Sequence, residues 1–167
     1  GRPSFKTLLT GIRDAWKNQK NQLLASGESV ARTLREQADR SGEKAVKLTT
    51  DLLKRGADQY LSQYDRTFGG FAAAPKFPRS HSLSFLLRYW KRSKEPMILE
   101  MVEKTLQEMA KGGMYDQLGG GFHRYSVDSQ WRVPHFEKML YDQAILAKSY
   151  LETYQVTQKT IYADVAR

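Results

Sequence analysis

The sequence contains no cysteine. A disulfide framework, a thiol nucleophile and a cysteine-ligated zinc or iron–sulfur site are therefore excluded within this chain. No run approaches the roughly 18 apolar residues of a membrane-spanning helix. No basic segment followed by an apolar stretch and a small-residue cleavage site opens the chain. We therefore predict no membrane contact and a cytoplasmic location.

Nucleic-acid-binding motifs and blocks of like charge are also lacking. The net charge is +9, with 27 Lys and Arg against 18 Asp and Glu. The basic excess is spread along the chain, with 12 basic against 7 acidic residues over 1–60 and 15 against 11 over 61–167. We interpret it as a solvated basic surface and predict no nucleic-acid partner.

What is present is the composition of an ordinary globular protein. The 167 residues include 40% hydrophobic and 27% charged residues, which is enough for about one domain with a core. The chain begins Gly1-Arg2-Pro3 without a methionine and stops within a helical pattern, so we expect a piece of a longer protein. A truncated helical domain exposes apolar helix faces, and we therefore expect self-association.

Apolar residues recur at helical spacing in several segments, which predicts a mainly helical protein. One stripe includes Phe5 and Trp16, a second runs from Val30 to Ala38 after Ser26-Gly27, and a third runs from Ala45 to Tyr64 after Ser41-Gly42-Glu43. Downstream, Ser80 or Ser82 is predicted to cap a helix, and Pro96 to begin another that ends in a left-handed Gly112-Gly113.

Two glycine-rich segments interrupt this pattern, at 65–80 and 112–134. The second is rich in aromatic residues and too long for an ordinary connection, which is typical of a functional loop. We predict a short hairpin in it, with 122–127 pairing with 131–133. The tripeptide Gly69-Gly70-Phe71 recurs at 120–122, which fits stacked helix pairs with glycine-rich loops on one face.

Pro134 is predicted to begin a strong helix with Phe136, Leu140, Gln143, Ala147, Leu151 and Tyr154 near one face, followed by a last helix from about Thr157. On a helical wheel His135 and Asp142 lie about 20° apart, and Lys138 lies about 60° from His135. These ionisable groups would border the buried face, where a cavity is expected.

The chemistry of this window supports two readings. Aromatic faces beside carboxylates and imidazoles suit a sugar, and a histidine can transfer a proton near neutral pH. The other reading is that Arg124, Asp128, Glu137 and Lys138 pair with one another and pin the loop to the helix. The three histidines lack metal-binding spacing, and Gly119-Gly120-Gly121 lacks the Lys-Ser/Thr of a phosphate-binding loop, so we predict no metal and no cofactor.

Three long strings within this region resemble the signatures of one family. They are Gly69-Gly70-Phe71 with 74–78, then 112–128, and 131–142. The family is that of the thioredoxin-domain-containing proteins similar to spermatogenesis-associated protein 20, known in bacteria as the YyaL group. Ala72 stands where the family is expected to have a glycine.

The resemblance implies an all-α fold, a partial (α/α)6 toroid similar to N-acylglucosamine 2-epimerases and six-hairpin glycosidases, with antiparallel helix pairs, glycine-rich loops and one short hairpin. Residues 1–64 would be a helical segment following an absent thioredoxin-like domain of the same polypeptide, and 65–167 the first helical hairpins of the toroid. By analogy with epimerase-like toroids, His123 and His135 would be the catalytic acid/base residues. The substrate-binding candidates are Asp116, Arg124, Tyr125, Asp128, Trp131, Glu137 and Asp142.

The implied function is that of a carbohydrate-active toroid with epimerase- or isomerase-like proton transfer on a small carbohydrate-like ligand. The isolated piece is expected to be inactive, because the cavity of a toroid is built from all of its hairpins. The alternatives are a non-catalytic ligand-binding or regulatory module partnered with the thioredoxin-like domain, and a redox-linked role in which the toroid is a client or substrate platform.

Overall fold

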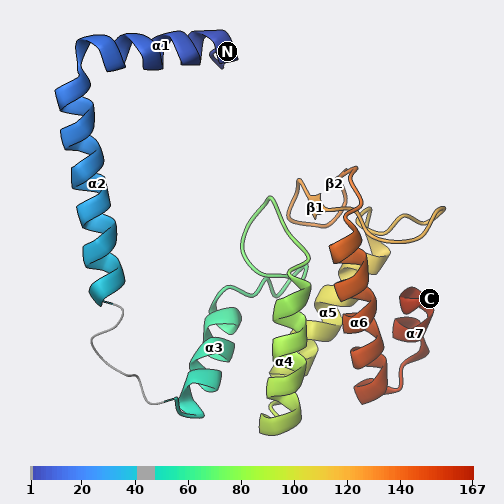
Figure 1. Ribbon diagram of the computed structural model, residues 1–167. Coiled ribbons are helices and arrows are strands. Elements are labelled where there is room, and N and C mark those ends of the chain that lie inside the picture. The colour runs from blue at the N-terminus through green and yellow to red at the C-terminus, as the bar shows by residue number, and fades with distance from the viewer. Residues whose placement is uncertain (1, 41–47) are drawn as a thin grey trace. The chain divides into compact units, whose positions relative to one another are not determined.

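The computed structural model describes residues 2–40 and 48–167. The chain forms two compact units, which meet in sequence between Leu48 and Thr49. Helices dominate both units, which confirms the predicted all-α class, and one small two-stranded sheet accompanies them (Figure 1). Within the described residues, none of the helices has an apolar stretch of the length that crossing a bilayer requires.

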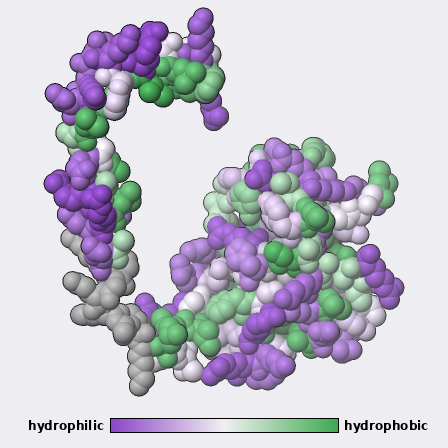
Figure 2. Space-filling view, in the orientation of Figure 1, coloured by the Kyte–Doolittle hydropathy of each residue, from purple (hydrophilic) through white to green (hydrophobic). Residues whose placement is uncertain are grey.

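The first unit contains α1 (Phe5–Asn18) and α2 (Lys20–Arg40). The Ser4 hydroxyl caps α1 by accepting a hydrogen bond from the Thr7 N–H. The predicted apolar stripe of α1 is present, and it lies on the surface, with Phe5 75% exposed (Figure 2). Ser26 and Gly27 were expected to precede a helix, but they lie inside α2. A helix interior can accommodate one glycine, at a cost of about 1 kcal/mol in stability. The predicted break at 41–43 and the residue Ala45 fall outside the described residues.

The second unit contains five helices and two strands. They are α3 (Asp51–Ser62), α4 (Ser80–Ser93), α5 (Pro96–Lys111), β1 (Tyr125–Ser126), β2 (Pro134–His135), α6 (Leu140–Thr157) and α7 (Thr160–Ala166). Helix α4 packs against α3, α5 and α6, and α6 packs against α7. The core between them includes Leu83, Leu86, Met101, Leu106, Trp131 and Tyr150. Helix α3 thus belongs to the second unit, although it precedes residue 65, where the predicted toroid segment begins.

Two predicted helix ends differ from the structure. Arg79, with φ 47°, precedes α4, while Ser80 and Ser82 lie buried in its first turn and cap nothing. Pro96 does begin α5, but Gly112, which follows that helix, has φ −83° and is not left-handed. A glycine is required there for another reason: a Cβ would lie 2.4 Å from the carbonyl oxygen of Trp131.

The helix predicted from Pro134 is wrong over residues 134–139. Pro134 and His135 form β2, which pairs antiparallel with β1, and α6 begins at Leu140. The Arg124 N–H donates to the carbonyl of Glu137 at 2.7 Å, so this segment pairs with the loop instead of coiling. His135, Lys138 and Asp142 consequently share no helix, and the helical-wheel argument fails.

The predicted apolar face of that helix is wrong as well. Helix α6 buries Leu146, Ser149, Tyr150 and Thr153, whereas Phe136 and Leu140 are 81% and 84% exposed. The short hairpin is confirmed, with its second strand at 134–135 instead of 131–133. The last helix begins at Thr160, after a left-handed Gln158 with φ 58°.

The glycine-rich repeat is a real structural repeat and is longer than the tripeptide that predicts it. We call residues 64–71 turn A and residues 115–122 turn B; both read Tyr-Asp, three variable residues, then Gly-Gly-Phe. The glycine pairs have φ of 67° and 79° in turn A and 71° and 78° in turn B. In both turns the Tyr and the Phe form an isolated β-bridge. Left-handed backbone at two successive positions explains why both are glycine.

An aspartate organises each turn in the same way. Asp65 accepts hydrogen bonds from the N–H groups of Thr67 and Phe68, and its carboxylate lies 2.6 Å from the Lys76 ammonium. Burial alone would raise the pKa of Asp65, but the Lys76 ammonium and these two N–H donors outweigh it and lower the pKa. Each turn is therefore held by an aspartate that its surroundings keep ionised.

Candidate functional site

A cavity of about 420 Å³ lies where α4 and α6 begin, and we call it the Arg124 cavity. The residues that line it come from the segment after turn A, the start of α4, the loop before β1 and the start of α6, and they are Phe77, Pro78, Arg79, Ser80, His81, Arg124, Tyr141, Asp142 and Ile145. The strands and loops lie at this same end of the helices (Figure 1). Loops positioned by a rigid helical scaffold commonly carry function.

A chain of polar contacts leads from this cavity to His135. The Arg124 guanidinium donates to the Glu137 carboxylate at 3.0 Å. The same carboxylate oxygen lies 3.5 Å from Nδ1 of His135, without a hydrogen bond between them. The hydrogen bond to Glu137 raises the pKa of Arg124. The His135 side chain is 41% exposed although its Nδ1 is buried.

An aromatic stack provides a second link between the cavity and His135. The Tyr125 ring lies between Phe77 and His135, with ring centroids 4.8 Å from each. The planes of Tyr125 and His135 are nearly parallel, at 21°. Phe77 belongs to the cavity wall, so the imidazole ends a row of three rings that begins in the cavity.

Asp142 is the acidic residue in the wall. Burial raises the pKa of its carboxyl group, and the charge of Arg124 opposes that rise. Two basic side chains, Arg79 and Arg124, line the same wall. The first turns of α4 and α6 add the partial positive charge of helix N-termini. The cavity thus combines a partly buried carboxyl group with guanidinium donors, an arrangement suited to a hydroxyl-rich or anionic ligand.

His123 lies apart from this arrangement. Its ring meets the Phe136 ring edge-on at 5.1 Å, and its Nδ1 is buried without a hydrogen-bond partner. Among the described residues that line the Arg124 cavity, neither His123 nor His135 is present. His135 differs from His123 in its link to the wall, because Glu137 lies beside it and pairs with Arg124.

Three other predicted binding residues support the loops. Asp116 accepts from the N–H groups of turn B and pairs with Lys138 at 2.6 Å, and the Gly119 N–H, the Lys138 ammonium and the Leu118 N–H hold its pKa well below the usual range. Burial alone would raise the pKa of Asp128, but the N–H donors of residues 130, 132 and 133 outweigh it and lower the pKa. Trp131 is fully buried and donates from Nε1 to the Phe68 carbonyl.

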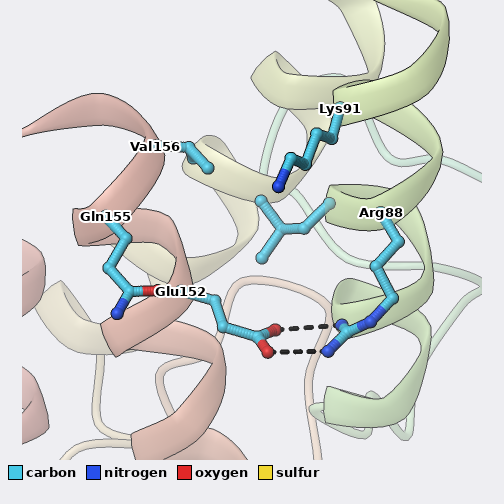
Figure 3. A pocket seen from close by; sticks show the side chains of 6 residues that line it. Arg88, Lys91, Glu152, Gln155 and Val156 are labelled. Carbon is cyan, nitrogen blue, oxygen red and sulfur yellow. Dashed lines mark hydrogen bonds and ion pairs between the residues drawn. The ribbon is translucent and has the colours of Figure 1, made fainter.

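A smaller groove of about 230 Å³ lies between α4 and α6 (Figure 3). Arg88 and Glu152 face each other across it through two hydrogen bonds, of 3.1 and 2.8 Å. Arg88 is exposed, and an exposed ion pair of this kind contributes at most about 1 kcal/mol to stability. We interpret this pair as a link between the two helices.

Seven of the nine wall residues, all but Arg124 and Asp142, are not among the predicted site residues. Phe77 lies in a loop without helical periodicity, and Tyr141 is not one of the apolar positions predicted for the helix from Pro134. The sequence could have indicated them only through the arrangement of the helices: two helices begin beside the same loops, so residues at the start of both helices line the same cavity.

Metal ligation has no comparable support, because residues 2–40 and 48–167 contain no group of three or more His, Asp or Glu side chains placed to hold an ion.

The comparisons with known proteins support the resemblance. The chain is 42% identical to human spermatogenesis-associated protein 20 over 99% of its own length, and 41% identical to the mouse protein over the same share. It is 37% identical to an uncharacterised protein of Caenorhabditis elegans over 95% of its length. It spans 22% of the length of each of these relatives. No protein-family model matches the chain.

Proposed function

We propose that this chain is a segment of a longer polypeptide in which the Arg124 cavity forms part of a carbohydrate-binding site of an α/α toroid. The observation that carries the proposal is the double link from the cavity to His135, through Arg124 and Glu137 and through Phe77 and Tyr125. Aromatic rings stack on the C–H faces of sugars, and carboxylates and guanidinium groups bond their hydroxyls. A thioredoxin-like domain of the same polypeptide and a cytoplasmic location belong to the same proposal.

His135 is the proposed acid/base residue. The Glu137 carboxylate lies 3.5 Å from Nδ1, and Nε2 is the proposed proton-transferring atom. In an epimerase or isomerase reaction, Nε2 would take the proton from the carbon next to the carbonyl. The electron pair of that C–H bond would pass to the carbonyl oxygen, giving an enediolate near the Arg124 guanidinium. Return of the proton to either carbon or face would complete the reaction. His123 remains the second acid/base candidate, and the remaining predicted binders would orient the ligand.

The proposal is tested by deuterium exchange in the longer polypeptide. The protein is incubated in D2O with aldoses, ketoses and N-acyl sugars and followed by proton NMR. We expect deuterium at the carbon next to the carbonyl, and at least a 100-fold slower exchange in the His135→Gln variant. Glu152→Gln is the matched control, because Glu152 also pairs with an arginine but faces the other groove. Its exchange rate should equal that of the unchanged protein.

The alternative, a ligand-binding module without turnover, is favoured by one observation. Asp116 and Lys138 bond to each other and Asp128 bonds to backbone N–H groups, so these charged groups already have structural partners. Sugar binding in calorimetry without deuterium exchange would establish that alternative. Exchange at an unchanged rate in His135→Gln would remove His135 from catalysis. A ligand affinity that changes when the cysteines of the longer polypeptide are reduced would instead support the redox-linked role.

A further inference from the structure

The two arginines in the wall of the Arg124 cavity differ in how they are paired. Arg124 donates to the Glu137 carboxylate at 3.0 Å. Arg79 is half-buried, and in residues 2–40 and 48–167 no acidic side chain pairs with it. Removing a guanidinium from water without a counter-ion is unfavourable, so the position of Arg79 favours a negatively charged partner in the cavity.

Asp142, the acidic residue of the same wall, does not supply that partner. Among the described residues, no ion pair joins its carboxyl group to Arg79 or Arg124. The wall therefore offers guanidinium donors to anionic oxygens, and it offers a separate carboxyl group to a hydroxyl of the ligand.

The Arg124 guanidinium also differs from the one in the groove between α4 and α6. Arg88 in that groove bonds to both carboxylate oxygens of Glu152 through its two terminal nitrogens, and its Nη1 also donates to the Ser84 carbonyl. The bond from Arg124 to Glu137 engages Nη1 alone. A guanidinium has five N–H donors in a planar fork, so Arg124 retains donors that a phosphate or carboxylate can use.

Backbone donors supplement these side chains. Helices α4 and α6 both begin without a side-chain cap. Within the part of the chain that the structure describes, no hydrogen bond engages the N–H groups of Ser80 and His81, which lie in the wall at the start of α4. N–H groups at the start of a helix bond readily to anionic oxygens. They add to the two guanidinium groups on the same side of the cavity's charge balance.

We propose that the Arg124 cavity binds a sugar that carries an anionic group, a phosphate or a carboxylate, and that Arg79 and Arg124 bond to the oxygens of that group. This inference rests on the proposed function in taking the ligand as a sugar, and it narrows the substrate class to acidic sugars. A neutral sugar would leave Arg79 without a counter-ion, whereas an anionic group supplies one. The exposed rings of Phe77 and Tyr141 are left for the C–H faces of the sugar.

Binding to the present chain tests the inference, because its own residues form the wall. Glucose is compared with glucose 6-phosphate and glucuronate, N-acetylglucosamine with its 6-phosphate, and inorganic phosphate is titrated alone. The amide NMR signals of Ser80 and His81 report binding at the wall. We expect an acidic sugar to bind at least about tenfold more tightly than its neutral counterpart, the factor that one charge-assisted hydrogen bond supplies. The two acids of glucose distinguish a phosphate from a carboxylate.

Substitutions of single arginines locate the anionic group. Arg79→Gln and Arg124→Gln should each lower the ratio of acidic to neutral sugar affinity at least about fivefold, and Arg79→Lys, which keeps the charge, should restore most of it. Arg79 also lines a neighbouring cavity beside α3, so the Arg124 variant decides which cavity holds the anion. Arg88→Gln is the matched control and should leave the ratio unchanged. The indole NMR signal of Trp131 verifies that each variant is folded.

Three outcomes would overturn the inference. Neutral sugars could bind as tightly as their acids, or no probe could move the Ser80 and His81 signals. The preference for acids could also survive both glutamine variants, because the net charge of +9 would then hold the anion elsewhere on the surface. Equal binding of neutral sugars would leave the proposed function intact. Conversely, an arginine-dependent preference for acids without deuterium exchange in the longer polypeptide would remove proton transfer and keep the anion site.

Discussion

Turns A and B share the hydrogen bonds of their aspartates and have nearly the same glycine angles, but they differ in how they are covered. The side chain of Lys76, which pairs with Asp65 of turn A, is fully buried, whereas that of Lys138, which pairs with Asp116 of turn B, is 37% exposed. Both ammonium groups lie 2.6 Å from their aspartates. Local sequence therefore sets the shape of the turn, whereas residues distant in sequence set how much each contact contributes to the free energy of unfolding.

The largest predicted effect is the loss of the buried ammonium. Lys76→Met should lower the free energy of unfolding of the second unit by about 4 kcal/mol, because Asp65 would lose its counter-ion in a largely buried site. The Ser129 carbonyl would also lose its donor. Lys138→Met is the matched control and should cost clearly less, because water reaches that pair. Urea unfolding followed through the indole NMR signal of Trp131 measures both; equal losses would mean that burial does not distinguish the turns.

A second substitution tests the cover of the glycines. Gly69→Ala should destabilise the second unit by about 3 kcal/mol, since φ is 67° and the new Cβ would lie 2.8 Å from the Thr105 Cα. Gly120→Ala, the equivalent change in turn B, should cost only about 1 kcal/mol, because Gly120 shares the left-handed angle and has open space around it. Thermal unfolding of the two variants gives the difference. A loss for Gly120→Ala as large as that for Gly69→Ala would contradict the conclusion that Gly120 is less covered than Gly69.

The smallest predicted effect concerns the residue after each turn. Ala72 follows turn A with φ 74°, a conformation that favours glycine, and His123 is its counterpart after turn B. Ala72→Gly should therefore stabilise the second unit by about 0.5 kcal/mol, the relief of backbone strain being partly offset by the greater freedom of glycine in the unfolded chain. A shift of about 2 °C in the melting temperature is the measure. A decrease in stability would show that the Ala72 methyl group makes contacts that outweigh the strain.

Sequence periodicity predicts most of the helices and fails where two segments pair. The buried face of α5 is predicted correctly, because Ile98, Met101 and Leu106 repeat at helical spacing against one core. The prediction fails over 134–139, because β2 and the hydrogen bond between the Arg124 N–H and the Glu137 carbonyl join this segment to residues 8 to 13 positions earlier in the chain. Periodicity within one segment contains no information about such a partner.

The candidate site shows the same division. His135, Arg124 and Asp142 do lie in one region, but the helical wheel that predicted their proximity is wrong. Arg124 and Asp142 share the wall of one cavity, and the pairing of β1 with β2 places His135 beside the same loop. Asp128 and Trp131, also predicted as binding residues, hold that loop through hydrogen bonds.

The sequence by itself determined the helical class, the two glycine-rich turns and the ionisable residues between them, because helix periodicity and left-handed glycines are local properties of the chain. Only the tertiary structure decided which turn is buried, which helix covers it, and that His135 lies beside Glu137, which pairs with Arg124 in the wall of a cavity. Burial depends on contacts between residues far apart in the sequence, and the same Asp-Lys pair is therefore expected to contribute differently in the two turns.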